Sequence, residues 1–123
     1  MKTALLLLAL AIVCEVTATS ALKASHGLSR LGPSLIVAVG YLGAFTLLAF
    51  VLETLPVGWT YAVWSGCGTV GAVLIGCWLY AERLSPRQGV GIALVVLGVA
   101  LLHRPAVEDA PAEAGAIVAP RAD

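Results

Sequence analysis

The sequence predicts an all-α membrane protein in which four transmembrane helices run up-down-up-down. Of the 123 residues, 60% are hydrophobic and 11% are charged, and the mean hydropathy is +0.99. A soluble domain of this size has too small a core to bury so much apolar surface. The apolar residues lie in long charge-free runs separated by short links, and short links make neighbouring helices antiparallel.

The first helix is expected at about residues 3–22, and the alternative for this segment is a cleaved signal peptide. Lys2, the apolar core and the small residues before Ala21 are similar to such a peptide. Two observations weigh against cleavage. The rest of the chain holds further membrane helices rather than a secreted domain, and Glu15 follows the apolar core directly. We therefore expect the segment to stay in the membrane with Glu15 at membrane depth.

Three further charge-free runs predict the other helices. They extend from Leu31 to Leu52, from Thr54 to Ala81 and from Gln88 to His103. A span needs roughly 20 apolar residues, so the first two runs fit one helix each. The last run is shorter, but Arg87 and Arg104 can carry their charges to the headgroups from its ends. The expected helices are 33–52, 58–80 and 87–103, which complete a transmembrane domain over residues 1–103.

The composition changes abruptly over residues 104–123. This segment holds Pro105, Pro111 and Pro120 together with charges of both signs. Such a composition predicts a disordered extension. A regulatory or partner-binding role is the alternative.

Composition and motifs exclude several classes of function. The formal net charge is +0 and no basic cluster is present, so we expect no nucleic-acid partner. Cys14, Cys67 and Cys77 lie in apolar runs without metal-ligand spacing, which is typical of small buried residues. His26 and His103 have no accompanying nucleophile, metal set or phosphate loop. We expect neither an enzyme nor a bound metal or cofactor.

Glu15 is the residue that most needs an explanation. An acidic residue at the centre of a membrane helix costs about 2.5 to 3.5 kcal/mol on insertion scales, and it usually faces a bundle interior or an aqueous cavity. Burial disfavours the charged form of a carboxylate, so Glu15 would take up a proton readily and would still pair with a cation. These two properties give Glu15 a physical basis for exchanging a proton for a cation. The alternative is a permanently protonated acid that hydrogen-bonds a neighbouring helix.

Half of the neighbours of Glu15 on its own helix are small. At helical spacing these neighbours are Leu8, Ala11, Ile12, Ala18, Thr19 and Leu22, and the small ones are Ala11, Ala18 and Thr19. Small residues leave space for a cavity beside the carboxylate, but they also serve close helix packing. The sequence leaves both interpretations open.

Aromatic residues on two other helices are candidate walls for a cation pocket. Tyr41 and Phe45 share one helix face, as do Tyr61 and Trp64. Aromatic faces attract organic cations, by about 0.5 to 2 kcal/mol. Membrane packing is the alternative role for each aromatic residue taken alone.

Glycines mark two further features. Gly66 and Gly68 follow Trp64 within one span and predict a helix bend or a close backbone approach. Gly91 and Gly98 share one face of the last helix and permit a close contact, including one between subunits. Four helices around a filled core leave little room for a polar route, so two copies of the chain would supply a central chamber.

Four stretches of the sequence occur in a characteristic order over roughly residues 4–103: AIVCEVTATSALKASHGLSRLGPS, YLGAFTLLAF, LPVGWTYAVWSGCG and GVGIALVVLGVALL. They closely resemble the small multidrug resistance family of bacterial four-helix, proton-coupled exporters. The resemblance implies an antiparallel homodimer in the bacterial inner membrane. It also implies exchange of protons for a small-molecule cation at paired Glu15 carboxylates by alternating access.

The resemblance implies roles for the other candidate residues. Gly91 and Gly98 would form the dimer contact. The residues that would line the pocket around Glu15 are Tyr61, Trp64, Tyr41, Phe45, Ala11, Ile12, Ala18 and Thr19.

The family includes a quaternary-ammonium branch and a guanidinium branch. The guanidinium branch typically has a tryptophan soon after its glutamate, whereas Val16, Thr17 and Ala18 stand here. The aromatic residues Tyr41 and Phe45 of the second expected helix also fit the multidrug branch, although the loop ETLPVG is closer to the guanidinium branch. The remaining alternatives are a guanidinium exporter, a transporter that needs a sister chain, and a non-transporting accessory subunit.

The orientation in the membrane stays open. With a cytoplasmic amino terminus, Lys2 and Arg104 lie inside, and the basic residues outside are Lys23, Arg30, Arg83 and Arg87. The positive-inside rule then favours an external amino terminus. This imbalance is compatible with either dual or single insertion.

Overall fold

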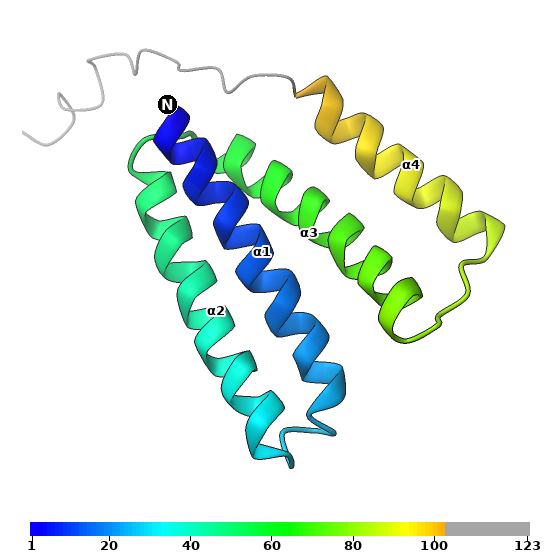
Figure 1. The fold of residues 1–123 in the computed structure, drawn as a ribbon. Helices are drawn as coiled ribbons and strands as arrows, with labels where there is room; N and C mark the ends of the chain where they lie inside the picture. Colours follow the sequence, from blue (N-terminus) through cyan, green and yellow to red (C-terminus); the bar gives the residue numbers. More distant parts are fainter. Residues whose placement is uncertain (103–123) are drawn as a thin grey trace, which may run out of the picture.

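The structure is a computed structural model, which describes residues 1–102, and that part of the chain folds into four helices without a strand (Figure 1). This confirms the predicted all-α class. The helices are α1 (Lys2–Ala24), α2 (Leu31–Leu52), α3 (Val57–Leu79) and α4 (Pro86–Leu101), each within one or two residues of its expected bounds. Their division into a transmembrane domain and a tail stays a prediction, because His103 and the expected tail lie outside the described residues.

Three helices have the length and composition needed to cross a membrane: α1, α2 and α3. Helix α4 is apolar but has only 16 residues. Large apolar side chains cover much of the surface, and Leu6, Leu42 and Trp78 are more than two-thirds exposed. An apolar exterior of this kind matches a lipid surrounding rather than water. The chain is therefore a multi-pass membrane protein.

Helices α1 and α2 pack along most of their length because small residues face one another. A Cβ atom placed on Gly40 would lie 2.8 Å from the Cβ atom of Ala18 and 3.1 Å from the carbonyl oxygen of Cys14. Ala18 is completely buried. Close backbone approach at small residues is the usual way in which helices associate inside a membrane.

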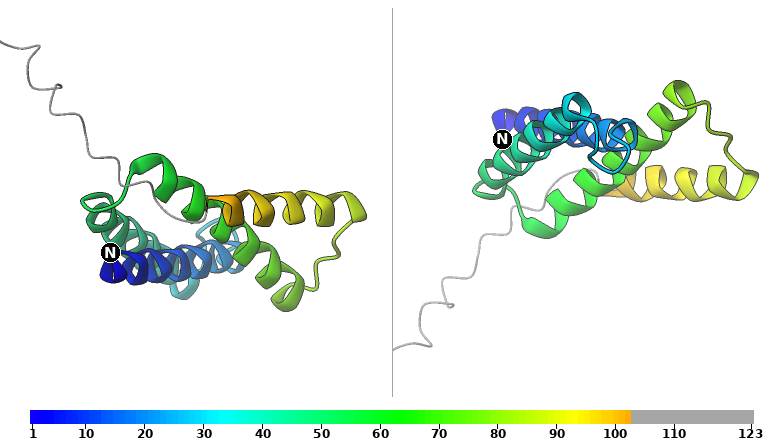
Figure 2. Two further views of the ribbon diagram at one scale, coloured as in Figure 1. Left: turned by 90° about the horizontal axis from the view of Figure 1, so that it is seen from above. Right: turned by 90° about the horizontal axis from the view of Figure 1, so that it is seen from below.

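Helix α3 crosses α1 on the side away from most of α2 (Figure 2). Glycines again allow the contact, since a Cβ atom on Gly71 would lie 3.0 Å from Val16. Near the first residues of α1, a buried apolar cluster joins the three helices: Ala4, Leu8, Leu48, Val51, Leu55 and Trp64. Three helices therefore share one core.

Local signals determine where the helices begin and end. After α1, Ser25 is completely buried, its hydroxyl donates to the Leu22 carbonyl at 2.7 Å, and it accepts from the Leu28 amide at 3.0 Å. Helix α4 begins with a capping box in which Ser85 and Gln88 satisfy each other's backbone amides.

Helix α4 lies beside α3 and, within residues 1–102, contacts no other helix (Figures 1 and 2). Its Val99 side chain faces Gly66, where a Cβ atom would collide with it. None of its described residues is buried. The expectation that four helices surround one filled core is therefore wrong for a single chain. The physical reason is that, among the described helices, α4 contacts only α3, and through one side of its surface.

Candidate functional site

Glu15 lies in the middle of α1, is partly buried, and faces α3 at Gly68. A Cβ atom on Gly68 would lie 2.6 Å from the Oε2 atom of Glu15 and 3.6 Å from its carboxyl carbon. The carboxylate thus occupies space that any other residue at position 68 would take. Within residues 1–102 it has neither a hydrogen-bond nor an ion-pair partner. An unpaired acid of this kind is available for an external proton or cation.

Four aromatic rings form a continuous row from α2 to α3, which we call the aromatic row: Tyr41, Phe45, Trp64 and Tyr61. The ring centroids are 6.5 Å apart for Tyr41 and Phe45, 5.6 Å for Phe45 and Trp64, and 5.7 Å for Trp64 and Tyr61. The structure therefore brings together two pairs that the sequence placed on separate helices. Trp64 is buried, whereas Phe45 and Tyr61 are more than half exposed.

A hydrogen bond connects the aromatic row to α1. The hydroxyl groups of Thr19 and Tyr41 are 2.9 Å apart. Thr19 lies one helical turn after Glu15, so this bond orients Tyr41 relative to the helix that carries the acid. Of the small residues predicted around Glu15, Thr19 is the one with a polar contact to the row.

Trp64 and Thr60 carry buried polar atoms without a partner. The indole Nε1 of Trp64 and the hydroxyl of Thr60 have no hydrogen-bond partner among the described residues. Because Thr60, Trp64 and Gly68 are each four residues apart, they share one face of α3. Leaving a buried donor unpaired costs about 1 to 3 kcal/mol, and such groups in native proteins call for an explanation. On this face Trp64 stands one helical turn before Gly68, the residue that faces Glu15.

The remaining predicted neighbours of Glu15 serve packing within the single chain. Ala11 and Ala18 are completely buried, and Ala18 lies against Gly40 of α2. Ile12 packs at the edge of the buried cluster around Leu8. Of the two interpretations left open by the sequence, the structure shows close helix packing at these positions. Their role in lining a pocket stays a prediction.

The glycines predicted to have special roles differ in their surroundings. Gly66 and Gly68 lie inside the continuous helix α3 and give room to Val99 and Glu15, respectively. Their proposed role in a helix bend stays a prediction. Gly91 and Gly98 are exposed, with open space where a Cβ atom would stand. Among the described residues, neither glycine makes a close contact on the face that they share.

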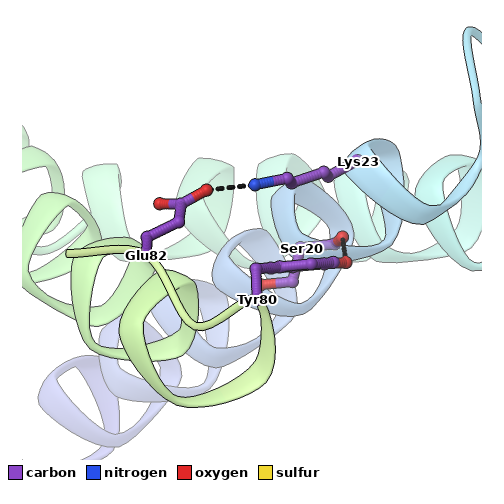
Figure 3. Close-up of polar contacts among 4 residues, drawn as sticks. All are labelled: Ser20, Lys23, Tyr80 and Glu82. Carbon is purple, nitrogen blue, oxygen red and sulfur yellow. Dashed lines mark hydrogen bonds and ion pairs between the residues drawn. The ribbon is translucent and has the colours of Figure 1, made fainter.

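Sequence reasoning missed one polar group, which we call the outer cluster: Ser20, Lys23, Tyr80 and Glu82 (Figure 3). The ammonium group of Lys23 donates to the carboxylate of Glu82 and lies 4.5 Å from the centre of the Tyr80 ring. The Tyr80 hydroxyl donates to the Ser20 carbonyl at 2.6 Å. The available signal was the antiparallel order, which places the opposite charges of residues 23 and 82 at the same end of the bundle.

Comparison with known proteins adds independent information. A family model described as Small Multidrug Resistance protein matches residues 3–95. The multidrug transporter PA4990 of Pseudomonas aeruginosa is 46% identical over 98 residues, which cover 80% of this chain and 89% of that protein. The quaternary ammonium compound-resistance protein QacE of Escherichia coli is 48% identical over 98 residues, with the same coverage of 80% and 89%. The guanidinium exporter of Escherichia coli strain K12 is 42% identical over 94 residues, covering 76% of this chain and 90% of that protein.

Proposed function

The chain belongs to the small multidrug resistance family of transporters, and from this premise we propose that it is a proton-coupled antiporter that exports quaternary ammonium and other lipophilic cations. It would act in the bacterial inner membrane, with α4 as a fourth, short span. The observation that carries the proposal is the unpaired Glu15 carboxylate at the middle of α1. A membrane-buried acid without a partner is costly, so a transport role explains its presence.

The proposed exchange uses one carboxylate for two ligands. In its charged form Glu15 binds a cation, and the aromatic row offers π faces to the same cation. Protonation removes the negative charge and releases the cation, so protons and substrate compete for Glu15. The indole N–H of Trp64, which has no hydrogen-bond partner among the described residues, would supply a hydrogen bond to the charged form. The site would open to one side of the membrane at a time, which couples the two flows.

We propose that the working unit is an antiparallel homodimer. In the single chain, Phe45 and Tyr61 expose more than half of their surface and α4 buries none of its described residues. A second copy would cover the aromatic row and bring a second Glu15 to the same chamber. The face of α4 that carries Gly91 and Gly98 would form the contact between subunits, because its glycines allow two backbones to approach.

Guanidinium export is the second candidate function. The chain is 42% identical to a guanidinium exporter, which is only slightly less than its 48% identity to a quaternary ammonium resistance protein. This similarity supports guanidinium as a candidate substrate class. Against it, Val16 follows the acid where the guanidinium branch typically has a tryptophan nearby, and Val16 is buried against Gly71. The mechanism at Glu15 would be the same for both substrates.

The test is transport by purified protein in liposomes with an imposed proton gradient. Uptake of a quaternary ammonium cation and of guanidinium is followed for the wild type, Glu15→Gln and Glu53→Gln. Glu53 is an exposed carboxylate that directly follows the last residue of α2, so its variant controls for loss of a negative charge. We expect gradient-driven uptake of the quaternary cation to vanish only in Glu15→Gln. Uphill transport by Glu15→Gln would contradict the proposal, and uptake of neither cation by the wild type would favour an accessory role or a missing sister chain.

A further inference from the structure

The seam between α1 and α3 continues from Glu15 towards the end of both helices. Glu15 faces Gly68, and one residue further Val16 faces Gly71. Beyond them lies a hollow of about 230 Å³ between the two helices. Its lining begins at Thr19, one turn after Glu15, and includes Ala72, one turn after Gly68. The hollow therefore starts next to the proposed exchange site.

The other end of this hollow is closed by the outer cluster. Lys23, Tyr80 and Glu82 all line it, and the ammonium group of Lys23 bridges from α1 to the carboxylate of Glu82 (Figure 3). The side chains of Lys23 and Glu82 are each 52% exposed, so the bridge stands where the hollow meets the surroundings of the protein. Because an exposed ion pair is weak, Lys23 is free to exchange its partners for water.

The backbone turn that follows α3 determines the position of Glu82. Ala81 has a φ of 51°, a left-handed conformation that residues other than glycine rarely adopt. This turn directs the amide of Glu82 back to the Gly76 carbonyl at 3.1 Å. The Glu82 carboxylate then covers Gly76, where a Cβ atom would lie 2.6 Å from Oε2. The backbone that places Glu82 at the hollow is therefore fixed independently of Lys23.

The ring of Tyr80 is likewise oriented without help from Lys23, through the hydrogen bond from its hydroxyl to the Ser20 carbonyl. A carboxylate beside a fixed aromatic face is a recognition element for an organic cation. Glu82 and Tyr80 thus combine a carboxylate with an aromatic ring, as Glu15 and the aromatic row do, and they lie at the opposite end of the hollow. In this structure the cation between them is the chain's own Lys23, with its nitrogen 4.5 Å from the ring centre.

We propose that Tyr80 and Glu82 form an outer site for organic cations, that Lys23 occupies it as a tethered cation, and that a substrate cation displaces Lys23 on its way through the hollow to Glu15. This inference rests on the proposed function, since it describes access to the same exchange site. It makes Lys23 a competitor of the substrate, whereas Glu82 and Tyr80 assist the substrate. The two members of one ion pair therefore have opposite effects on the rate of cation binding.

The experiment measures the association rate of benzyltrimethylammonium with the full chain by stopped-flow fluorescence. The chain has three tryptophans, so Trp59→Phe with Trp78→Phe leaves Trp64 of the aromatic row as the sole reporter. We expect Lys23→Gln to bind the cation about two- to fivefold faster, and Glu82→Gln and Tyr80→Leu to bind it about two- to fivefold more slowly, as expected for one exposed cation–π or ion-pair contact. Tyr80→Phe keeps the ring but loses the hydrogen bond to Ser20 that orients it, so it should slow binding less than Tyr80→Leu does.

Two controls separate the outer site from simpler explanations. Arg83→Gln removes an exposed positive charge next to Glu82, so it reports electrostatic steering alone. An equal acceleration in Arg83→Gln and Lys23→Gln would overturn the proposal. So would changes of the same sign in Lys23→Gln and Glu82→Gln, which indicate a purely structural ion pair. Glu15→Gln in the same background should give no signal, and a parent protein without any Glu15-dependent signal would overturn the proposed function instead. Circular dichroism confirms that each variant keeps its helix content.

Discussion

At the scale of single residues, the site depends on how the residues around Glu15 hold its carboxylate. They restrict the space that it can occupy, but none of the described residues forms a hydrogen bond or an ion pair with it. Gly68 gives it room, Trp64 presents an unpaired indole nitrogen one turn away, and Thr19 orients Tyr41. The acid itself was evident in the sequence because a charge inside an apolar run is conspicuous. Its partner Gly68 was not, because only the crossing of α1 and α3 shows which of several glycines faces the carboxylate.

The variant Gly68→Ala tests the confinement of the acid. The added methyl group would lie 2.6 Å from Oε2, so the flexible end of Glu15 must move while the backbone stays in place. We expect the affinity for a quaternary cation to fall by about tenfold or more, with stability unchanged within about 1 kcal/mol, because alanine also favours the helix. Calorimetric titration and unfolding in mild detergent measure the two effects. Gly89→Ala, at a position with open space, is the control, and equal affinities in the two variants would contradict this account.

The hydrogen bond between Thr19 and Tyr41 is tested by a double-mutant cycle. Thr19→Val and Tyr41→Phe each remove one hydroxyl and keep the shape of the side chain. We expect each to weaken cation binding by about 0.5 to 1.5 kcal/mol, and the double variant to be no weaker than the more affected single variant, because the same bond is lost. Additive losses would mean that the two hydroxyls act separately.

At the scale of secondary structure, the charge-free runs were sufficient to predict the helices but not their packing. Helix α2 begins at Leu31 and ends at Leu52, which are the first and last residues of a charge-free run. Ala18 and Gly40 show why packing was harder to predict, since a small residue suits a cavity and a close contact equally well. The detachment of α4 from α1 and α2 depends on the path of the preceding loop, and no periodicity in the sequence encodes that path.

The contact between α3 and α4 is tested at Gly66. A methyl group there would collide with the stiff, branched side chain of Val99. Overpacking of this kind costs about 1 to 3 kcal/mol, so Gly66→Ala should lower the free energy of unfolding by that amount. Unfolding by a denaturing detergent provides the measurement. The double variant with Val99→Ala should regain most of the loss, and a double variant less stable than Gly66→Ala would show that the collision is not the cause.

At the scale of the whole molecule, three features of the single chain motivate the proposed dimer. Three helices share a core, a fourth stands beside them, and half of the aromatic row is exposed. In the proposed dimer, the second copy would cover the exposed half of the row and would give α4 a partner.

The dimer contact is tested by Gly98→Leu. Within residues 1–102, and apart from its chain neighbours and the backbone of its own helix, no atom lies within 4 Å of a Cβ atom at this position, so the larger side chain should leave the fold of one chain intact. We expect it to weaken dimerisation in lipid by about tenfold or more, because glycine at a helix contact allows close approach. Energy transfer between labelled chains at decreasing protein-to-lipid ratios measures the equilibrium. Gly89→Leu is the matched control, and an unchanged dimer fraction in Gly98→Leu would place the contact elsewhere.

The central claim is that protons and cations compete for Glu15, and proton release on cation binding tests it most directly. Purified protein in weakly buffered detergent solution is mixed with a quaternary ammonium cation, and a pH indicator records the protons that leave the protein. We predict that the wild type and Glu53→Gln release protons in proportion to the cation bound, whereas Glu15→Gln releases none and binds the cation at least tenfold more weakly. Undiminished proton release from Glu15→Gln, or cation binding to the wild type without release at any pH, would contradict the claim.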